Sequence, residues 1–225
     1  MPLTQEWING HIYMDKIVNS KSNDNLKIKK EAIRLNQNGL KELLFGNVEK
    51  SIELFKKSIT TDQNYSDPYF NLANIHIQAY DYEKSEILYE KAIELNCHNA
   101  DYYFNLAISQ TNLNKPYEAI KSYESSLALE PENTKALKFL GNCYKDLKRF
   151  NDALNIYNKW KSIDKDNPEP EFNKSLIHIR NGRFDIGWKL YESGLKNNIR
   201  EPLSGYYEET KEIWDGQPFD GTLLI

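Results

Sequence analysis

The strongest constraint on the fold of this chain is a repeat of 34 residues that recurs five times without insertion or deletion. Repeats that begin at residues 32, 66, 100, 134 and 168 place small side chains at the same three positions. The eighth, twentieth and twenty-seventh positions hold Gly, Ala or Ser in fourteen of fifteen cases, and Trp160 is the exception. Small residues at fixed spacing allow two helices to approach closely where they cross. The pattern predicts helical units that stack on one another.

An aromatic residue at the twenty-fourth position of each repeat complements the small residues. The five rings are Phe55, Tyr89, Tyr123, Tyr157 and Tyr191. A large ring beside small side chains fills a packed layer. Each repeat is therefore predicted to form two antiparallel helices of about four turns. The turns between them are expected near residues 45–47, 80–81, 114–116, 148–149 and 181–183, which are rich in Gly, Asn and Asp.

This pattern resembles the tetratricopeptide repeat family, and the likeness covers residues 32 to about 201. The resemblance implies an all-α fold, a right-handed α-solenoid of five helix-turn-helix repeats. Their limits would be residues 32–65, 66–99, 100–133, 134–167 and 168–201. In this family the first helix of each repeat lines a concave groove that binds a protein or an extended peptide. The alternative is an irregular helical bundle.

The N-terminal residues 1–31 lie outside the repeats. Residues 4–18 place five apolar side chains on one helical face, namely Trp7, Ile8, Ile12, Ile17 and Val18. We expect a short extra helix there that is able to cover the first repeat. Residues 19–25, NSKSNDN, predict a flexible linker.

The C-terminal residues 202–225 form a tail that breaks the repeat. Gly216 and Gly221 precede a β-prone apolar run that ends at Ile225, which predicts the entry into a strand and the possible start of an α/β domain. The tail resembles a segment that precedes a glycosyltransferase-like domain in bacterial tetratricopeptide proteins. This leaves a second function open, in which the chain is the repeat region of such a protein and recruits substrate or mediates self-association.

The first candidate binding residues are amides at the sixth position of three repeats, Asn71, Asn105 and Asn173. An amide carries both a donor and an acceptor, so a row of amides can bond an extended peptide backbone. The row resembles the asparagine ladder in the repeat region of O-linked N-acetylglucosamine transferase. The alternative is that each amide only bonds a neighbouring turn inside the solenoid.

A second group of candidates lies beside the amides. Phe70 and Phe104 occupy the fifth position of their repeats, and Asn74 occupies the ninth. Exposed in a groove, the two rings would be apolar anchors for a peptide. Buried between repeats, they would instead belong to the core.

A third group is basic. Lys138, Asn142 and Lys145 are spaced four and three residues apart, which places them on one helical face, and Arg180 follows in the next repeat. They predict a patch for an acidic peptide or a terminal carboxylate, and resemble part of the carboxylate clamp of chaperone-binding members of the family. The alternative is a solvated charged face.

Other functions are disfavoured by composition and motifs. A net charge of −4 lacks the basic excess of nucleic-acid-binding proteins, and no apolar run is long enough to span a membrane. The first residues do not form a signal peptide, and Cys97 and Cys143 suit free thiols in a reducing cytoplasm. The four histidines form no metal-binding motif. We therefore expect a cytoplasmic, non-enzymatic protein without cofactor or metal. The resemblance implies a bacterial protein whose partner is a protein or peptide, and which could oligomerise through its end repeats.

Overall fold

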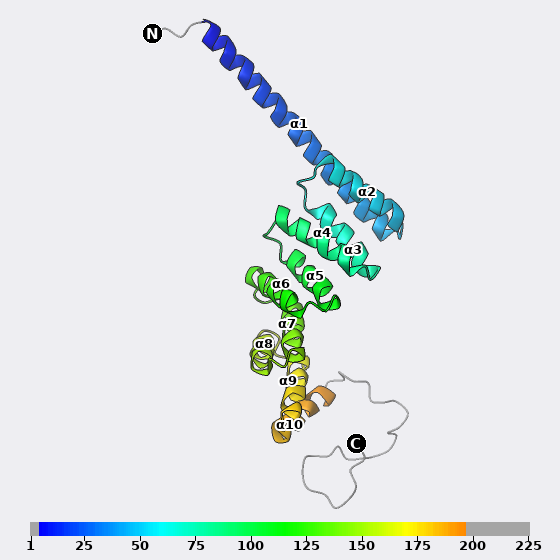
Figure 1. Cartoon of the computed structure of the whole chain (residues 1–225), viewed down its shortest axis with the longest axis vertical. Coiled ribbons are helices and arrows are strands. Elements are labelled where there is room, and N and C mark those ends of the chain that lie inside the picture. The colour runs from blue at the N-terminus through cyan, green and yellow to red at the C-terminus, as the bar shows by residue number, and fades with distance from the viewer. Residues whose placement is uncertain (1–4, 197–225) are drawn as a thin grey trace, which may run out of the picture. The chain divides into compact units, whose positions relative to one another are not determined.

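The computed structural model describes residues 5–196 of the 225-residue chain, with side chains described from residue 24 to residue 192. The described part contains ten α-helices and no strand, which confirms the all-α prediction (Figure 1). In chain order the helices are α1 (Gln5–Leu44), α2 (Val48–Thr61), α3 (Asp67–Gln78), α4 (Tyr82–Leu95), α5 (Ala100–Asn112), α6 (Pro116–Leu129), α7 (Thr134–Asp146), α8 (Phe150–Ile163), α9 (Glu169–Arg180) and α10 (Phe184–Lys196).

The turn inside each helix pair repeats with the same period as the sequence. A residue with positive φ ends the first helix of every pair, and these residues lie 34 positions apart: Gly46, Tyr80, Asn114, Lys148 and Gly182. The left-handed conformation allows the next amides to bond back to the helix end. In the second repeat, for example, the Tyr80 N–H donates to the Ile77 carbonyl (3.0 Å) and the Asp81 N–H to the His76 carbonyl (2.9 Å). All five predicted turns are confirmed.

The chain divides into two compact units, an N-terminal unit (Met1–Asn114) and a C-terminal unit (Lys115–Ile225). In the N-terminal unit one buried cluster joins Phe55 to Leu72 and Ile75. In the same unit Tyr89 packs with Ala73 and Leu106. In each cluster, aromatic and aliphatic side chains from successive repeats share one core.

The predicted packing of small residues against the repeated aromatic is confirmed in both units. A Cβ added to Gly39 would lie 2.6 Å from the Phe55 ring, and a Cβ added to Gly141 would collide with the Tyr157 ring. Ala73 is fully buried in the cluster that contains Tyr89. The eighth and twenty-fourth positions of a repeat therefore meet, as large and small partners, where its two helices cross.

The predicted linker at residues 19–25 is wrong, because α1 runs without a break from Gln5 to Leu44. Figure 1 shows its N-terminal part extending well past the end of α2. Ser, Asn and Asp in that segment are residues that favour loops. These residues are only weakly unfavourable in a helix, and neither proline nor glycine occurs between Gly10 and Gly39 to interrupt the helix. The five apolar side chains predicted to cover the first repeat lie outside the described side chains.

The first repeat differs from the others on the side that faces away from the second repeat. Its third, seventh and tenth positions are Arg34, Asn38 and Lys41, of which Arg34 and Lys41 are exposed. The same positions of the second repeat hold Pro68, Leu72 and Ile75, which are buried. The array therefore begins with a polar face, as the end of a stacked structure requires. We call these three residues the polar N-terminal face.

Candidate functional site

The first residue of the predicted amide row bonds to an asparagine of the preceding repeat. Asn71 is buried, and its Nδ2 donates to Oδ1 of Asn36 on α1 over 2.9 Å. Nδ2 of Asn36 in turn donates to the Tyr65 hydroxyl over 3.3 Å. The Asn71 side chain therefore joins two successive repeats, which corresponds to the structural alternative for this position.

The same network continues to a carboxylate shared by two tyrosines. The hydroxyl groups of Tyr65 and Tyr102 donate to the two oxygens of Asp67, over 2.8 and 2.6 Å. Ser66 Oγ lies 3.1 Å from the Tyr102 hydroxyl. Burial, together with the bond to Asp67, raises the pKa of Tyr102 to about 12 and raises that of Tyr65 further. Both hydroxyls thus remain protonated and donate to Asp67, while the Tyr65 hydroxyl also accepts from Asn36, and these bonds connect α1, α3 and α5.

The asparagines at the ninth position share a second kind of bond. The Tyr89 hydroxyl donates to Oδ1 of Asn74 over 2.6 Å, and the Tyr157 hydroxyl donates to Oδ1 of Asn142 over 2.8 Å. Burial raises the pKa of both tyrosines. Because each amide oxygen accepts from a tyrosine, the amide NH₂ group is the end that can donate to a ligand. Asn74 and Asn142 are both half-buried.

The other predicted amides are more accessible than Asn71. Asn105 is half-buried, and its Nδ2 donates to the Asp101 carbonyl one turn earlier in α5, over 2.9 Å. Asn173 is half-buried on α9. Within the N-terminal unit, Asn71 and Asn105 therefore donate to different partners, Asn36 and the Asp101 carbonyl.

The two predicted phenylalanines are partly covered. The Phe70 ring lies 4.8 Å from that of Tyr102 and 5.8 Å from that of Tyr89, and it packs against the cluster of Ala73, Tyr89 and Leu106. Phe104 is half-buried. Phe70 thus contributes to the packing between repeats, which corresponds to the core alternative.

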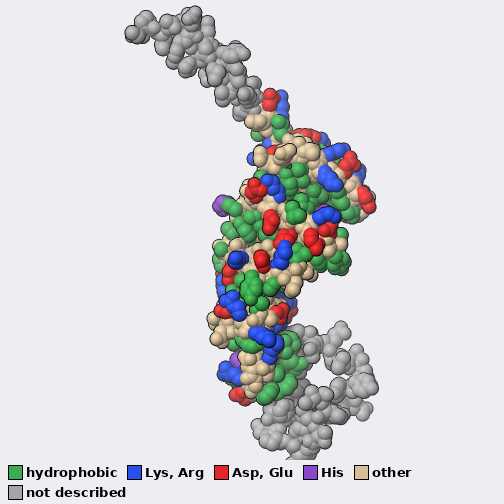
Figure 2. Space-filling model, viewed as in Figure 1, with side chains coloured by type: hydrophobic (Ala, Val, Ile, Leu, Met, Phe, Trp, Pro, Cys, Tyr) green, Lys and Arg blue, Asp and Glu red, His purple; other side chains and the backbone are tan. Residues whose placement is uncertain are grey.

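The predicted basic residues have specific neighbours in the C-terminal unit. Lys138 Nζ forms an ion pair with Glu169 of α9 over 2.5 Å, so part of the predicted positive charge is neutralised. Lys145 Nζ lies 3.4 Å from Oδ1 of Asn142, which brings these two predicted residues together. Arg180 is exposed, and its guanidinium lies 5.7 Å from the centre of the Phe150 ring. On the face drawn in Figure 2, basic and acidic side chains are intermixed.

One candidate was missed by the sequence prediction. Phe139 occupies the sixth position of its repeat, where three other repeats have asparagine. Its side chain is 37% exposed, and its ring stacks on that of Tyr123 with a centroid distance of 6.1 Å and an interplanar angle of 8°. Lys135 and Lys138 precede it on α7. The break in the amide row was the available signal for an apolar anchor at this place.

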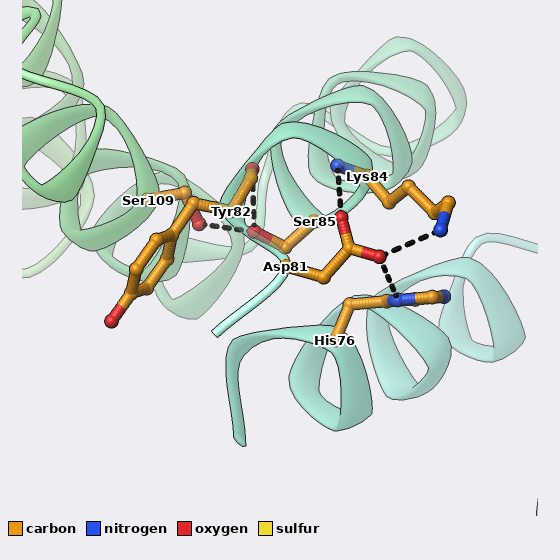
Figure 3. A network of polar contacts seen from close by, with 6 residues as sticks. All are labelled: His76, Asp81, Tyr82, Lys84, Ser85 and Ser109. Atoms are coloured by element: carbon orange, nitrogen blue, oxygen red, sulfur yellow. Dashed lines mark hydrogen bonds and ion pairs between the residues drawn. The ribbon is translucent and has the colours of Figure 1, made fainter. Parts of the chain in front are cut away.

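A polar cluster at the turn of the second repeat is structural. Figure 3 shows Asp81 between His76 of α3 and Lys84 of α4. Asp81 accepts from the Lys84 N–H at the start of α4 and lies 2.7 Å from Lys84 Nζ and 3.2 Å from Nδ1 of His76. Its bonds to Lys84 lower the pKa of Asp81. These contacts cap α4 and fix the turn.

Among the described residues, no group of three or more His, Cys, Asp or Glu side chains is placed to hold a metal ion. Of the helices described, none combines the length and apolar character that crossing a membrane requires.

The chain is similar to known helical repeat proteins. Sequence models of the tetratricopeptide repeat match residues 66–99 and 113–171. A crystal structure of MamA shares 18% identity with a TM-score of 0.70, covering 80% of this chain and 99% of that one. YrrB, described as a TPR protein with an unusual peptide-binding site, shares 16% identity with a TM-score of 0.69, covering 79% of this chain and 90% of its own.

A shorter match carries a bound peptide. The first TPR of Spaghetti (RPAP3), bound to the HSP90 peptide SRMEEVD, is 25% identical with a TM-score of 0.51, and covers 53% of this chain and 95% of its own. No curated protein sequence matches the chain. The predicted likeness of residues 202–225 to a segment before a glycosyltransferase-like domain lies outside the described residues, and so does the predicted strand.

Proposed function

Because the chain belongs to the tetratricopeptide repeat family, we propose that it is a non-enzymatic interaction module that binds an extended peptide segment of a partner protein along the first helices of its repeats. The observation that carries this proposal is the accessible face of α7. There Phe139 is 37% exposed and Lys135 is exposed, while Asn142 presents its NH₂ group beside Lys145. An apolar anchor, an amide donor and two cations within three helical turns suit a peptide with acidic and apolar side chains.

The two units divide the candidate residues by role. In the N-terminal unit Asn71 and Phe70 serve the packing between repeats, and Asn105, Asn74 and Phe104 remain as candidate contacts. The C-terminal unit contributes the α7 face with Lys138, and Asn173 and Arg180 of α9. We place the stronger contacts on α7, since its accessible side chains combine charge with an aromatic ring.

Binding to α7 can be tested with a labelled acidic peptide. The peptide SRMEEVD, which is bound by a similar protein, serves as the probe in fluorescence anisotropy, and a peptide with lysine in place of its acidic residues serves as the comparison. We expect Phe139→Ala and Lys145→Ala each to weaken binding about tenfold, equivalent to about 1.4 kcal/mol. Both side chains are partly exposed, so circular dichroism should show little loss of thermal stability.

Lys159→Ala provides the matched control, because Lys159 is an exposed lysine on α8, the second helix of the same repeat. This variant should bind the acidic peptide like the wild type. Equal affinity of the wild type, Phe139→Ala and Lys145→Ala for the acidic peptide, or equal affinity of the wild type for both peptides, would remove α7 as the proposed acidic-peptide site.

A further inference from the structure

An ion pair joins the first helices of the fourth and fifth repeats beside the proposed peptide site. Lys138 Nζ of α7 lies 2.5 Å from Oε2 of Glu169 at the start of α9, and the two side chains are 38% and 35% exposed. The exposed ring of Phe139 follows Lys138 directly, and Asn142 lies one helical turn further along α7. Glu169 therefore places a carboxylate on a cation of the surface that we assign to an acidic peptide.

The stacking of repeats does not require this ion pair. Lys138 occupies the fifth position of its repeat, and Glu169 occupies the second position of the next repeat. At the other three junctions these two positions hold residues that cannot form an ion pair with each other: Asn36 and Asp67, Phe70 and Asp101, Phe104 and Lys135. The pair is thus a particular feature of the junction that follows α7.

The start of α9 is held by contacts that do not involve the carboxylate of Glu169. The Glu169 backbone N–H donates to Oδ1 of Asn167 over 2.9 Å, and Nδ2 of Asn167 donates to Oδ2 of Asp164 over 2.9 Å. The carbonyl of Asn167 accepts from Lys161 Nζ over 2.9 Å. Since an ion pair this exposed adds little to stability, folding alone does not account for the Glu169 side chain.

A carboxylate that is already paired with a lysine opposes the binding of a second carboxylate. The ammonium group of Lys138 has three donors, so a peptide carboxylate can reach it while Glu169 is present. The two carboxylates then repel each other across a short distance. Peptide binding at Lys138 therefore exchanges one partner for another, and the net gain is smaller than at a lysine without an acidic partner.

We propose that Glu169 is an internal competitor for acidic peptides, which holds Lys138 in the unbound protein and lowers the affinity of the α7 face. An acidic group alone is then insufficient for tight binding, and the peptide must also contact Phe139 and Lys145. This inference rests on the proposed function of α7 and concerns its selectivity.

Fluorescence anisotropy of the full chain with the labelled peptide SRMEEVD tests this role. We expect Glu169→Gln to bind the peptide about three- to fivefold more tightly than the wild type at low salt, which is the range of an exposed charge pair. The difference should disappear at about 1 M salt, where charges are screened beyond about 3 Å. The matched control, Glu118→Gln, makes the same change in net charge at an exposed residue of α6 and should bind like the wild type.

Lys138→Ala shows whether the effect acts through the ion pair. It should weaken binding by a larger factor in the Glu169→Gln background than in the wild type, because the lysine then has no competing carboxylate. Equal factors in the two backgrounds would overturn the competitor role. Thermal unfolding followed by circular dichroism checks that Glu169→Gln stays folded.

The two proposals fail in different ways. Tighter binding of the acidic peptide than of the lysine-substituted peptide, without a gain in Glu169→Gln, would remove the competitor role and leave the α7 site in place. Equal affinity of the wild type for both peptides would remove the acidic-peptide site, and the competitor role with it.

Discussion

A tyrosine of the second helix and an asparagine of the first are bonded in two repeats, and the first repeat has an apolar version of this pair. Tyr89 bonds Asn74, and Tyr157 bonds Asn142. The same positions of the first repeat hold Phe55 and Leu40. At the scale of single residues, the tyrosine hydroxyl and the asparagine amide therefore satisfy each other's hydrogen-bonding capacity, and a repeat can lack both groups.

We predict that the Tyr89–Asn74 pair is energetically coupled. Tyr89→Phe removes one hydrogen bond and should cost about 1 kcal/mol of unfolding free energy, while Asn74→Leu leaves a buried hydroxyl unsatisfied and should cost about 1–3 kcal/mol. The double variant recreates the combination of the first repeat and should cost less than the sum of the two single changes. Urea unfolding of all four proteins measures the coupling. Strict additivity would show that the bond contributes nothing specific.

The positive-φ position of the turns allows a second test at this scale. Gly182 has φ of +73° and no atom within 4 Å of an added Cβ. We expect Gly182→Ala to cost about 1 kcal/mol through backbone strain alone, whereas Lys148→Gly, at the same position of the preceding repeat with φ of +60°, should leave stability unchanged or raise it slightly. Thermal unfolding distinguishes these effects, and a loss of stability in Lys148→Gly would mean that the lysine side chain supports the turn.

At the scale of helices, polar contacts between repeats fix their order in the N-terminal unit. Asp67 at the start of α3 accepts from Tyr65 and from Tyr102 of α5, and Asn36 of α1 bonds Asn71. Such contacts join residues 29 and 35 positions apart. They are specific to these repeats, because each of these groups bonds to a residue of another repeat.

We expect this network to make stability fall at alkaline pH. The pKa of Tyr102 is raised to about 12 from an ordinary value near 10. The folded state therefore holds the proton more tightly than the unfolded chain. The contribution is fully present below pH 10 and is lost as the pH rises from about 10 to about 12. Thermal unfolding from pH 7 to pH 11.5 should show a weaker decline for Tyr102→Phe than for the wild type. Parallel declines would assign the pH dependence to other groups.

At the scale of the whole chain, the period was sufficient to predict the helices and their turns. Small and aromatic residues recur at fixed positions because the two helices of each repeat pack in the same way, with a small residue of the first helix against a ring of the second. Gly141 and Tyr157 are an example. The break at residues 19–25 was predicted wrongly, because local composition does not decide whether a helix continues.

The candidate site was less predictable than the fold. Asn71 and Phe70 occupy positions typical of a groove, but their partners are Asn36 and Tyr102 in adjacent repeats. Lys138 was predicted to belong to a basic patch, but it forms an ion pair with Glu169, 31 residues later in the sequence. A pattern read within one repeat identifies the face of a helix, whereas the accessibility of a side chain depends on the side chains that the next repeat supplies.

The polar N-terminal face also restricts how such a chain can gain length by gene duplication. A copy of an inner repeat added in front of the first would bring apolar side chains against Arg34, Asn38 and Lys41, and removing charged and polar groups from water is costly. A copy inserted between two inner repeats would instead find apolar partners on both sides, such as Leu72 and Ile75. Gene duplication is therefore expected to lengthen the array by inserting copies between inner repeats, while the present first repeat stays first in the array.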